Sequence, residues 1–136
     1  MNNADSERIE FIPRKEKIKK MTNENIIEYF IALSKKRTEA DSYMDIYTYN
    51  KIYKILQVIE KELKSRPGDQ RSILIPLIFH PNLQVRLNAS LATLAVTPDA
   101  LMMLRAIAAL DVAWEPEQIE ALHSVEAIDE GRYIPT

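Results

Sequence analysis

The chain has 136 residues, of which 46% are hydrophobic and 28% charged, a balance typical of a globular domain and inconsistent with wholesale disorder. It has no cysteine, which excludes a disulfide framework, a thiolate metal site and a thiol nucleophile. It also has no apolar run long enough to span a membrane, and the N-terminal residues lack the pattern of a secretory signal. We therefore expect a cytoplasmic protein without membrane segments.

The formal net charge of −2 hides a gradient along the chain. Residues 1–20 carry six Lys or Arg against four acids, whereas residues 111–136 carry Arg132 against seven acids. A nucleic-acid-binding protein generally needs a basic stripe to replace the counterions around phosphates, and the short run at 14–20 is the one basic stretch. Nucleic acid is therefore not an expected partner.

The apolar residues recur at helical spacing along most of the chain. The spacing predicts a helix over 23–37 and a longer one over 42–65, the latter opened by a capping box formed by Ser42 and Asp45. Pro67 and Gly68 then break the pattern. A third helix is predicted over 70–79, bent or short because Pro76 lies inside it.

Three corners with proline follow, 17 or 18 residues apart. Pro81 and Asn82 predict the first corner, with Asn82 capping a helix that starts at residue 83. Thr97, Pro98 and Asp99 give a strong start signal for the next helix. The last helix is predicted to start near residue 115 and to end at Gly131, and the final residues are expected to form an extended tail. Each interval of 17 or 18 residues has room for one helix and one corner. Two such intervals make a helical hairpin of the length found in helical repeats.

The segment LIPLIFHPNLQVRLNASLATLAV resembles a HEAT-type repeat in its Leu-rich first helix, its corner, and its Val-Arg pair followed by alanines. Together with ELKSRPGDQR and the ending IDEGRYIP, it is similar to a family of short bacterial proteins of unknown function. The resemblance covers about residues 22–136. It implies an all-α, HEAT-like superhelix of about six helices and no particular reaction. Residues 22–136 are expected to form a single domain, and residues 1–21 an N-terminal arm.

His80 and Arg86 could line a groove as an acid/base group and an anion clamp, but acid/base catalysis also needs a group that orients the histidine. We favour a structural role, in which His80 ends a helix and Arg86 pairs with an acid, for which Asp99 is a candidate. A metal site is not expected because His80 and His123 are far apart in the sequence and belong to no ligand motif. No cofactor is expected.

Two groups of residues could bind a partner protein. Tyr43 and Tyr47 belong to a dense tyrosine cluster, and tyrosine is enriched at binding surfaces. In the same cluster, Tyr49 belongs to the core-facing stripe of its helix and Tyr53 is expected to flank that stripe. The second group lies in the acidic C-terminal region and consists of Trp114, Glu115, Glu117 and Glu120. An acidic surface beside an aromatic side chain could attract and hold a basic partner.

The sequence therefore favours a non-enzymatic protein-binding module. The resemblance adds one specific version, an immunity protein that neutralises a bacterial toxin. Two alternatives stay open: a small-ligand or enzyme-like protein with a site around His80 and Arg86, and a structural homodimer, since helical repeats with incompletely capped ends tend to associate.

Overall fold

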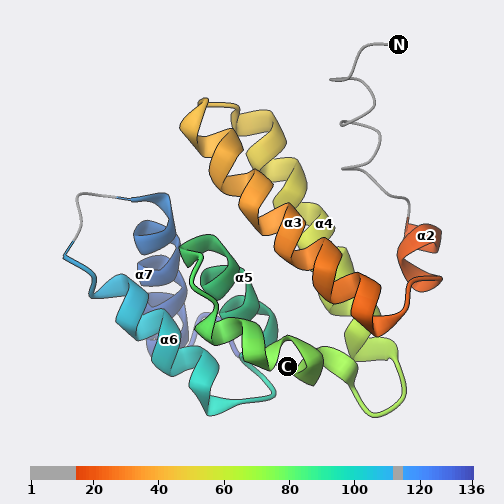
Figure 1. Cartoon of the computed structure of the whole chain (residues 1–136). Coiled ribbons are helices and arrows are strands. Elements are labelled where there is room, and N and C mark those ends of the chain that lie inside the picture. Colours follow the sequence, from red (N-terminus) through yellow and green to blue (C-terminus); the bar gives the residue numbers. More distant parts are fainter. Residues whose placement is uncertain (1–14, 112–114) are drawn as a thin grey trace. The chain divides into compact units, whose positions relative to one another are not determined.

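The computed structural model describes residues 15–111 and 115–136. Within these ranges the chain is helical and contains no strand, which confirms the predicted all-α class (Figure 1). The chain forms two compact units, Met1–Gln70 and Arg71–Thr136, where the sequence predicted one domain over residues 22–136.

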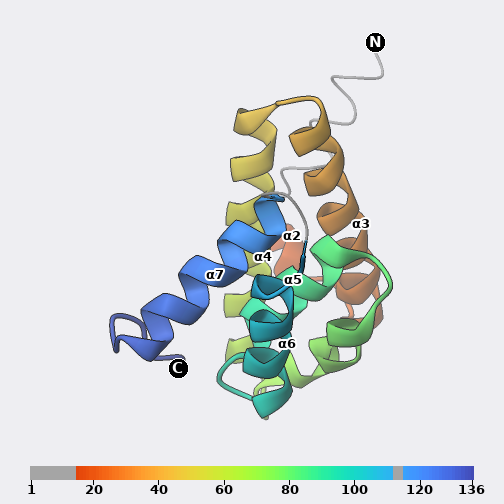
Figure 2. The same cartoon turned by 90° about the vertical axis from the view of Figure 1, so that its left-hand side faces the viewer.

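The first unit contains α2 (Lys15–Lys19), α3 (Asn23–Ser42) and α4 (Ile46–Ser65). The two long helices, α3 and α4, pack along each other as a hairpin, and α2 contacts α4 (Figures 1 and 2). Ile18 of α2 is fully buried, so the expected N-terminal arm contains a packed helix. The buried apolar residues of this unit include Ile18, Ile26, Phe30, Leu33, Ile52, Leu56, Ile59 and Leu63.

The helix predicted over 42–65 starts four residues later, at Ile46, and the predicted capping role of Ser42 is wrong. Ser42 is the last residue of α3, and its hydroxyl donates to the carbonyl of Thr38. Asp45 alone caps α4, since its carboxylate accepts from the backbone N–H of Thr48 at 3.1 Å and from the Thr48 hydroxyl at 2.6 Å. No glycine or proline interrupts residues 38–42, so α3 continues past its predicted end.

The second unit contains most of η1 (Gln70–Phe79), followed by α5 (Leu83–Thr93), α6 (Pro98–Ala108) and α7 (Pro116–Asp129). Helix α6 packs against both α5 and α7. The core of the unit consists of Leu87, Leu104, Ile107, Ala121 and Val125, with Leu83, Leu91, Leu94, Leu101, Met103 and Ala108 packed around it.

Residues 70–79 are helical as predicted, but they form a 3-10 helix instead of an α-helix. Pro76 lacks the N–H that an α-helix would donate to the carbonyl four residues earlier. The preceding connection is a type II turn, in which the backbone N–H of Asp69 donates to the carbonyl of Arg66 and Gly68 has a φ of 79°.

The predicted caps of the second unit are confirmed. The side chain of Asn82 accepts from the N–H of Val85 at 3.0 Å, and that of Thr97 accepts from the N–H of Asp99 at 3.3 Å. Pro98 and Pro116 occupy first-turn positions, where a missing N–H has no cost.

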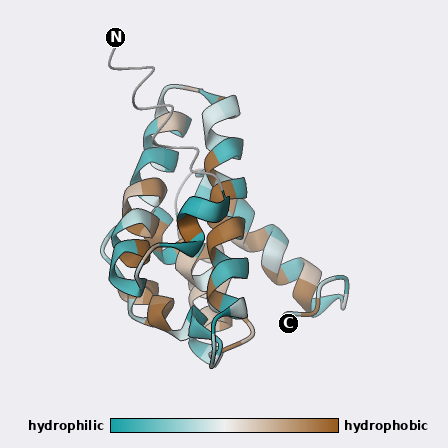
Figure 3. Cartoon of the chain, turned by 90° about the vertical axis from the view of Figure 1, so that its right-hand side faces the viewer, coloured by the Kyte–Doolittle hydropathy of each residue, from teal (hydrophilic) through white to brown (hydrophobic). Residues whose placement is uncertain are grey.

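Among the described residues, no helix has the length and apolar character needed to cross a membrane. Polar and apolar residues alternate in bands along the helices (Figure 3).

Candidate protein-interaction surface

The turn between α3 and α4 exposes four large apolar side chains within five consecutive positions. Tyr43, Met44, Ile46 and Tyr47 are 79%, 83%, 69% and 73% exposed, and we refer to them as the turn cluster. The turn lies at the end of the hairpin opposite α2 (Figure 1). Single exposed apolar residues are common on protein surfaces, but a group confined to one turn is typical of an interaction site.

The backbone at Met44 is left-handed, with a φ of 55°. The N–H of Met44 donates to the carbonyl of Asp41 and the N–H of Asp45 donates to the carbonyl of Ala40, which is the Schellman motif that ends many helices. Glycine is the residue usually found at this position because a Cβ atom is disfavoured in the left-handed region. The turn therefore places a strained, exposed methionine where the fold alone would favour glycine.

The same chain ends α7 with the same motif and a glycine. Gly131 has a φ of 73°, its N–H donates to the carbonyl of Ile128, and the N–H of Arg132 donates to the carbonyl of Ala127. The two helix ends differ in the residue at the left-handed position, so the methionine in the first is not a requirement of the motif. A strained residue with an exposed side chain points to a function for that side chain.

Two cations contact tyrosine rings in the first turns of α4. The buried guanidinium of Arg37 lies over the ring of Tyr49 at 4.1 Å and near that of Tyr53 at 5.0 Å. Lys51 lies over the ring of Tyr47 at 4.9 Å and donates to its hydroxyl at 3.0 Å. These contacts restrict the rings, and a restricted aromatic side chain loses less entropy when it binds.

The predicted partner-binding residues have different locations. Tyr43 and Tyr47 lie together in the exposed turn, whereas Trp114 lies outside the described residues. In the acidic region Glu115 is exposed and Glu120 is half-buried. Glu117 is buried, so its predicted place on an exposed acidic surface is wrong. The reason is helical periodicity, because Glu117 shares the inward face of α7 with the buried Ala121 and Val125.

Further acids of the C-terminal region are neutralised by neighbouring bases. Asp129 accepts two hydrogen bonds from the Arg105 guanidinium, at 2.7 and 3.0 Å, and Glu130 accepts from Arg132 at 2.6 Å. The hydrogen bonds from Arg105, together with its charge, lower the pKa of Asp129. The net acidic surface is therefore smaller than the sequence suggests.

The lowered pKa of Asp129 predicts a pH dependence of stability. Asp129 binds a proton less readily in the folded state, so its contribution is complete above the ordinary aspartate pKa of about 3.9 and is lost as the pH falls through the lower folded value. The unfolding temperatures of the native chain and of Asp129→Asn should therefore converge as the pH is lowered from 7 to 3. Because both side chains are half exposed, the difference at pH 7 is expected to be small, and one that grows in acid would contradict this assignment.

The corner at residues 80–82 contains a hydrogen bond between His80 and the backbone. The Nδ1 atom of His80 accepts a hydrogen bond from the backbone N–H of Asn82 at 3.0 Å, so this ring nitrogen is occupied by the corner itself. The Nε atom of Arg86 is buried and has no acceptor among the described residues. The predicted ion pair between Arg86 and Asp99 is not formed in the part of the chain that the structure describes. Residues 15–111 and 115–136 contain no group of three His, Asp or Glu able to hold a metal ion.

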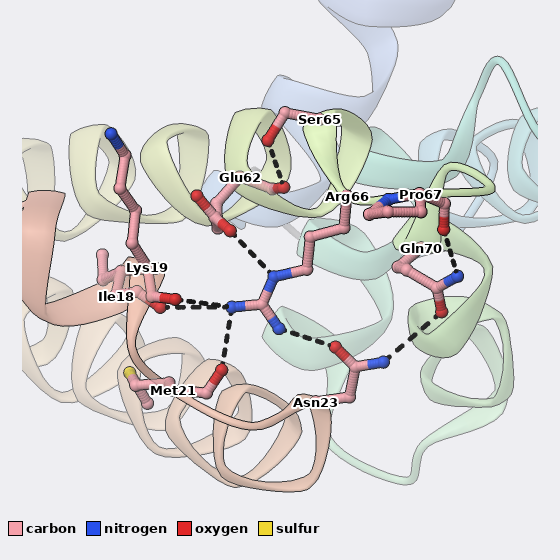
Figure 4. Close-up of polar contacts among 9 residues, drawn as sticks. All are labelled: Ile18, Lys19, Met21, Asn23, Glu62, Ser65, Arg66, Pro67 and Gln70. Carbon is pink, nitrogen blue, oxygen red and sulfur yellow. Dashed lines mark hydrogen bonds and ion pairs between the residues drawn. The ribbon is translucent and has the colours of Figure 1, made fainter.

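Sequence reasoning missed Arg66, which joins the ends of all three helices of the first unit (Figure 4). Its guanidinium donates to the Glu62 carboxylate, the Asn23 side chain and the Met21 carbonyl, each at 2.8 Å. It also lies 3.3 and 3.4 Å from the carbonyl oxygens of Ile18 and Lys19, at the end of α2. The spacing of Glu62 and Arg66 predicts an ion pair on one helix, but the other acceptors lie more than 40 residues away in the sequence.

Together these features define an all-helical protein, over the residues that the structure describes, with an exposed apolar turn. Residues 24–129 match a family described as a domain of unknown function, DUF2019, and because the match covers most of the chain, the chain belongs to this family. A solved structure, the protein RPA1889 from Rhodopseudomonas palustris CGA009, is 32% identical with a TM-score of 0.80, over 88% of this chain and 98% of that chain. No curated protein matches the chain.

Proposed function

We propose that the chain is a cytoplasmic, non-enzymatic protein-binding module that docks through the turn cluster. The observation that carries this proposal is Met44, whose side chain is 83% exposed while its backbone occupies a position that favours glycine. Folding gains little from this side chain and is opposed by its backbone conformation. A binding role accounts for a residue that stability alone would not select.

The composition of the turn cluster also fits a docking surface. Tyrosine and methionine are enriched at the centres of protein interfaces, since both combine a large contact area with either a rigid ring or an adaptable chain. The cluster is exposed at a helix–helix turn, where a partner can reach all four side chains, Tyr43, Met44, Ile46 and Tyr47.

The alternative, a small-ligand or enzyme-like site at His80 and Arg86, has less support. A general base needs a ring nitrogen with a free lone pair, whereas Nδ1 of His80 already accepts from the corner backbone, which leaves the proton of the neutral ring on Nε2. The buried, unpaired Nε of Arg86 is better explained by packing of its stem than by a clamp for an anion.

Neutralisation of a basic toxin is a more specific form of the proposal, and it has weaker support than docking at the turn. It depends on an acidic surface, but Glu117 is buried, and Asp129 and Glu130 are paired with arginines. A HEAT-like arrangement is likewise proposed for the second unit, on the basis of short helices joined at proline-containing corners.

The proposal is tested by photo-crosslinking in cells of the organism that encodes the chain. With p-benzoylphenylalanine at position 43, illumination should give an adduct of defined mass, and the same label at the exposed Lys64 position, at the other end of α4, should not. Equal labelling at both positions, or none at position 43, would refute docking at the turn.

The variant Met44→Gly separates binding from stability because the two effects have opposite signs. Removal of the left-handed strain should raise the free energy of unfolding by about 1 kcal/mol, measured by urea denaturation. The adduct at position 43 should nevertheless decrease, since a central apolar contact is lost. An unchanged adduct yield would show that Met44 has no part in docking.

A further inference from the structure

We propose that the partner that docks on the turn cluster presents a basic segment, in which lysine or arginine flanks an apolar side chain. This inference rests on the proposed function and specifies the chemistry of the partner. The exposed side chains of the turn cluster account for the apolar part of the contact. The charges in the same turn indicate the basic part.

The turn contains carboxylates and no base. Residues 38–50 include Glu39, Asp41 and Asp45 but no lysine, arginine or histidine. The backbone places two of these acids beside the apolar residues, because the N–H of Met44 donates to the carbonyl of Asp41 at 2.9 Å and Asp45 is the next residue of the chain. Asp41 and Asp45 are both exposed. Negative charge and apolar surface therefore occupy the same turn.

The bases that flank this turn in the sequence have contacts of their own. Lys36 pairs with Glu39 at 3.5 Å, and the buried Arg37 stacks on aromatic rings. Lys51 lies over the ring of Tyr47 and donates to its hydroxyl. Within the described ranges of the chain, no base forms an ion pair with the carboxylate of Asp41.

The stability of the fold does not explain Asp41. This residue lies in the last turn of α3, where the negative end of the helix dipole favours a cation and where the helix has no base. Asp45, by contrast, has a structural reason because it caps α4. Asp41 and Met44 thus both oppose the stability of one turn. A partner with positive charges beside an apolar side chain accounts for both residues.

Charge reversal at Asp41 tests the inference through the photo-crosslink at position 43. Asp41→Lys should lower the yield of the adduct at least about tenfold, because it places a like charge against the basic segment. The same variant should leave the midpoint of urea denaturation unchanged or raise it, since a cation suits the end of α3. A decrease in binding without a decrease in stability is not expected from a structural role.

The matched control is Glu28→Lys, which makes the same change of charge at an exposed position of the same helix. Position 28 lies about 20 Å from position 41 along the helix axis, farther than the distance over which salt screens exposed charges. This variant should keep the adduct yield within about twofold of the native value.

The adduct also reports the chemistry of the partner directly. Mass spectrometry of the digested adduct should place the crosslink in a segment where lysine or arginine flanks an apolar residue. When the crosslinking is repeated in a lysate, a rise in salt from about 0.05 to 0.3 M should lower the yield several-fold, because salt screens the attraction between exposed charges.

The outcomes distinguish this inference from the proposed function. The inference is overturned by an adduct that survives Asp41→Lys or high salt, or one that joins position 43 to an acidic or uncharged segment or to the same turn of a second copy. In each of these cases docking at the turn stays supported. Equal losses in Asp41→Lys and Glu28→Lys also overturn the inference, since the effect would then follow from the net charge of the chain. The absence of any adduct at position 43 refutes docking and the inference together.

Discussion

Replacement of Arg66 by alanine should lower the free energy of unfolding of the first unit by about 3 kcal/mol. The variant removes a charge-assisted donor from the side chains of Glu62 and Asn23. It also removes the donor to the main-chain carbonyls of Ile18, Lys19 and Met21. The Glu62 and Arg66 side chains are only 13% and 17% exposed, so water replaces these hydrogen bonds poorly.

Two measurements test this expectation. Urea denaturation gives the free energy of unfolding, and hydrogen exchange in peptides that cover α2 and the start of α3 locates the loss of protection. Arg66→Lys keeps the charge but cannot reach acceptors in several directions, and it should recover less than half of the loss. The matched control is Arg132→Ala, since the Arg132–Glu130 pair is exposed and should contribute within about 0.5 kcal/mol. Equal effects of the two alanine variants would contradict the role assigned to Arg66.

Replacement of Leu104 by alanine should destabilise the second unit by about 3 kcal/mol. Leu104 is fully buried in the core cluster of this unit, on the helix that packs against both α5 and α7. The truncation removes apolar contacts and leaves a cavity that the surrounding helices fill only in part.

Thermal unfolding followed by circular dichroism measures this effect. Met102→Ala is a suitable control because Met102 lies on the same helix, two residues earlier, and is more than half exposed. It should change the stability by no more than about 0.5 kcal/mol. A similar loss in both variants would show that α6 does not face the core through Leu104.

Most of the local structure could be predicted because it depends on signals close together in the sequence. The side chains of Asn82 and Thr97 cap helices whose first backbone N–H groups lie within three residues of them, and both caps are found where predicted. Pro98 is likewise found in the first turn of α6, as predicted. The start of α4 was misplaced because Ser42 and Asp45 can both serve as caps, and the left-handed turn at Met44, which chooses between them, has no sequence signature in a methionine.

The candidate surface could be predicted only in part. Residue type identified Tyr43 and Tyr47, but the contribution of Met44 depends on its backbone conformation, which composition does not reveal. Glu117 was misassigned because the charge count was considered without the helical position, although its spacing from Ala121 and Val125 carries that information. Arg66 depends on acceptors distant in the sequence, so no local pattern indicates its contacts.

The contacts of Arg66 also have a consequence for the order of folding. Its bonds to Met21, Asn23 and the end of α2 close a loop of more than 40 residues, and they require the end of α4 to lie beside the start of α3. The entropy of closing that loop is offset only once the α3–α4 hairpin has formed. Because a helix of five residues has little stability of its own, we expect α2 to dock last and to be the first helix of this unit to exchange its amide protons.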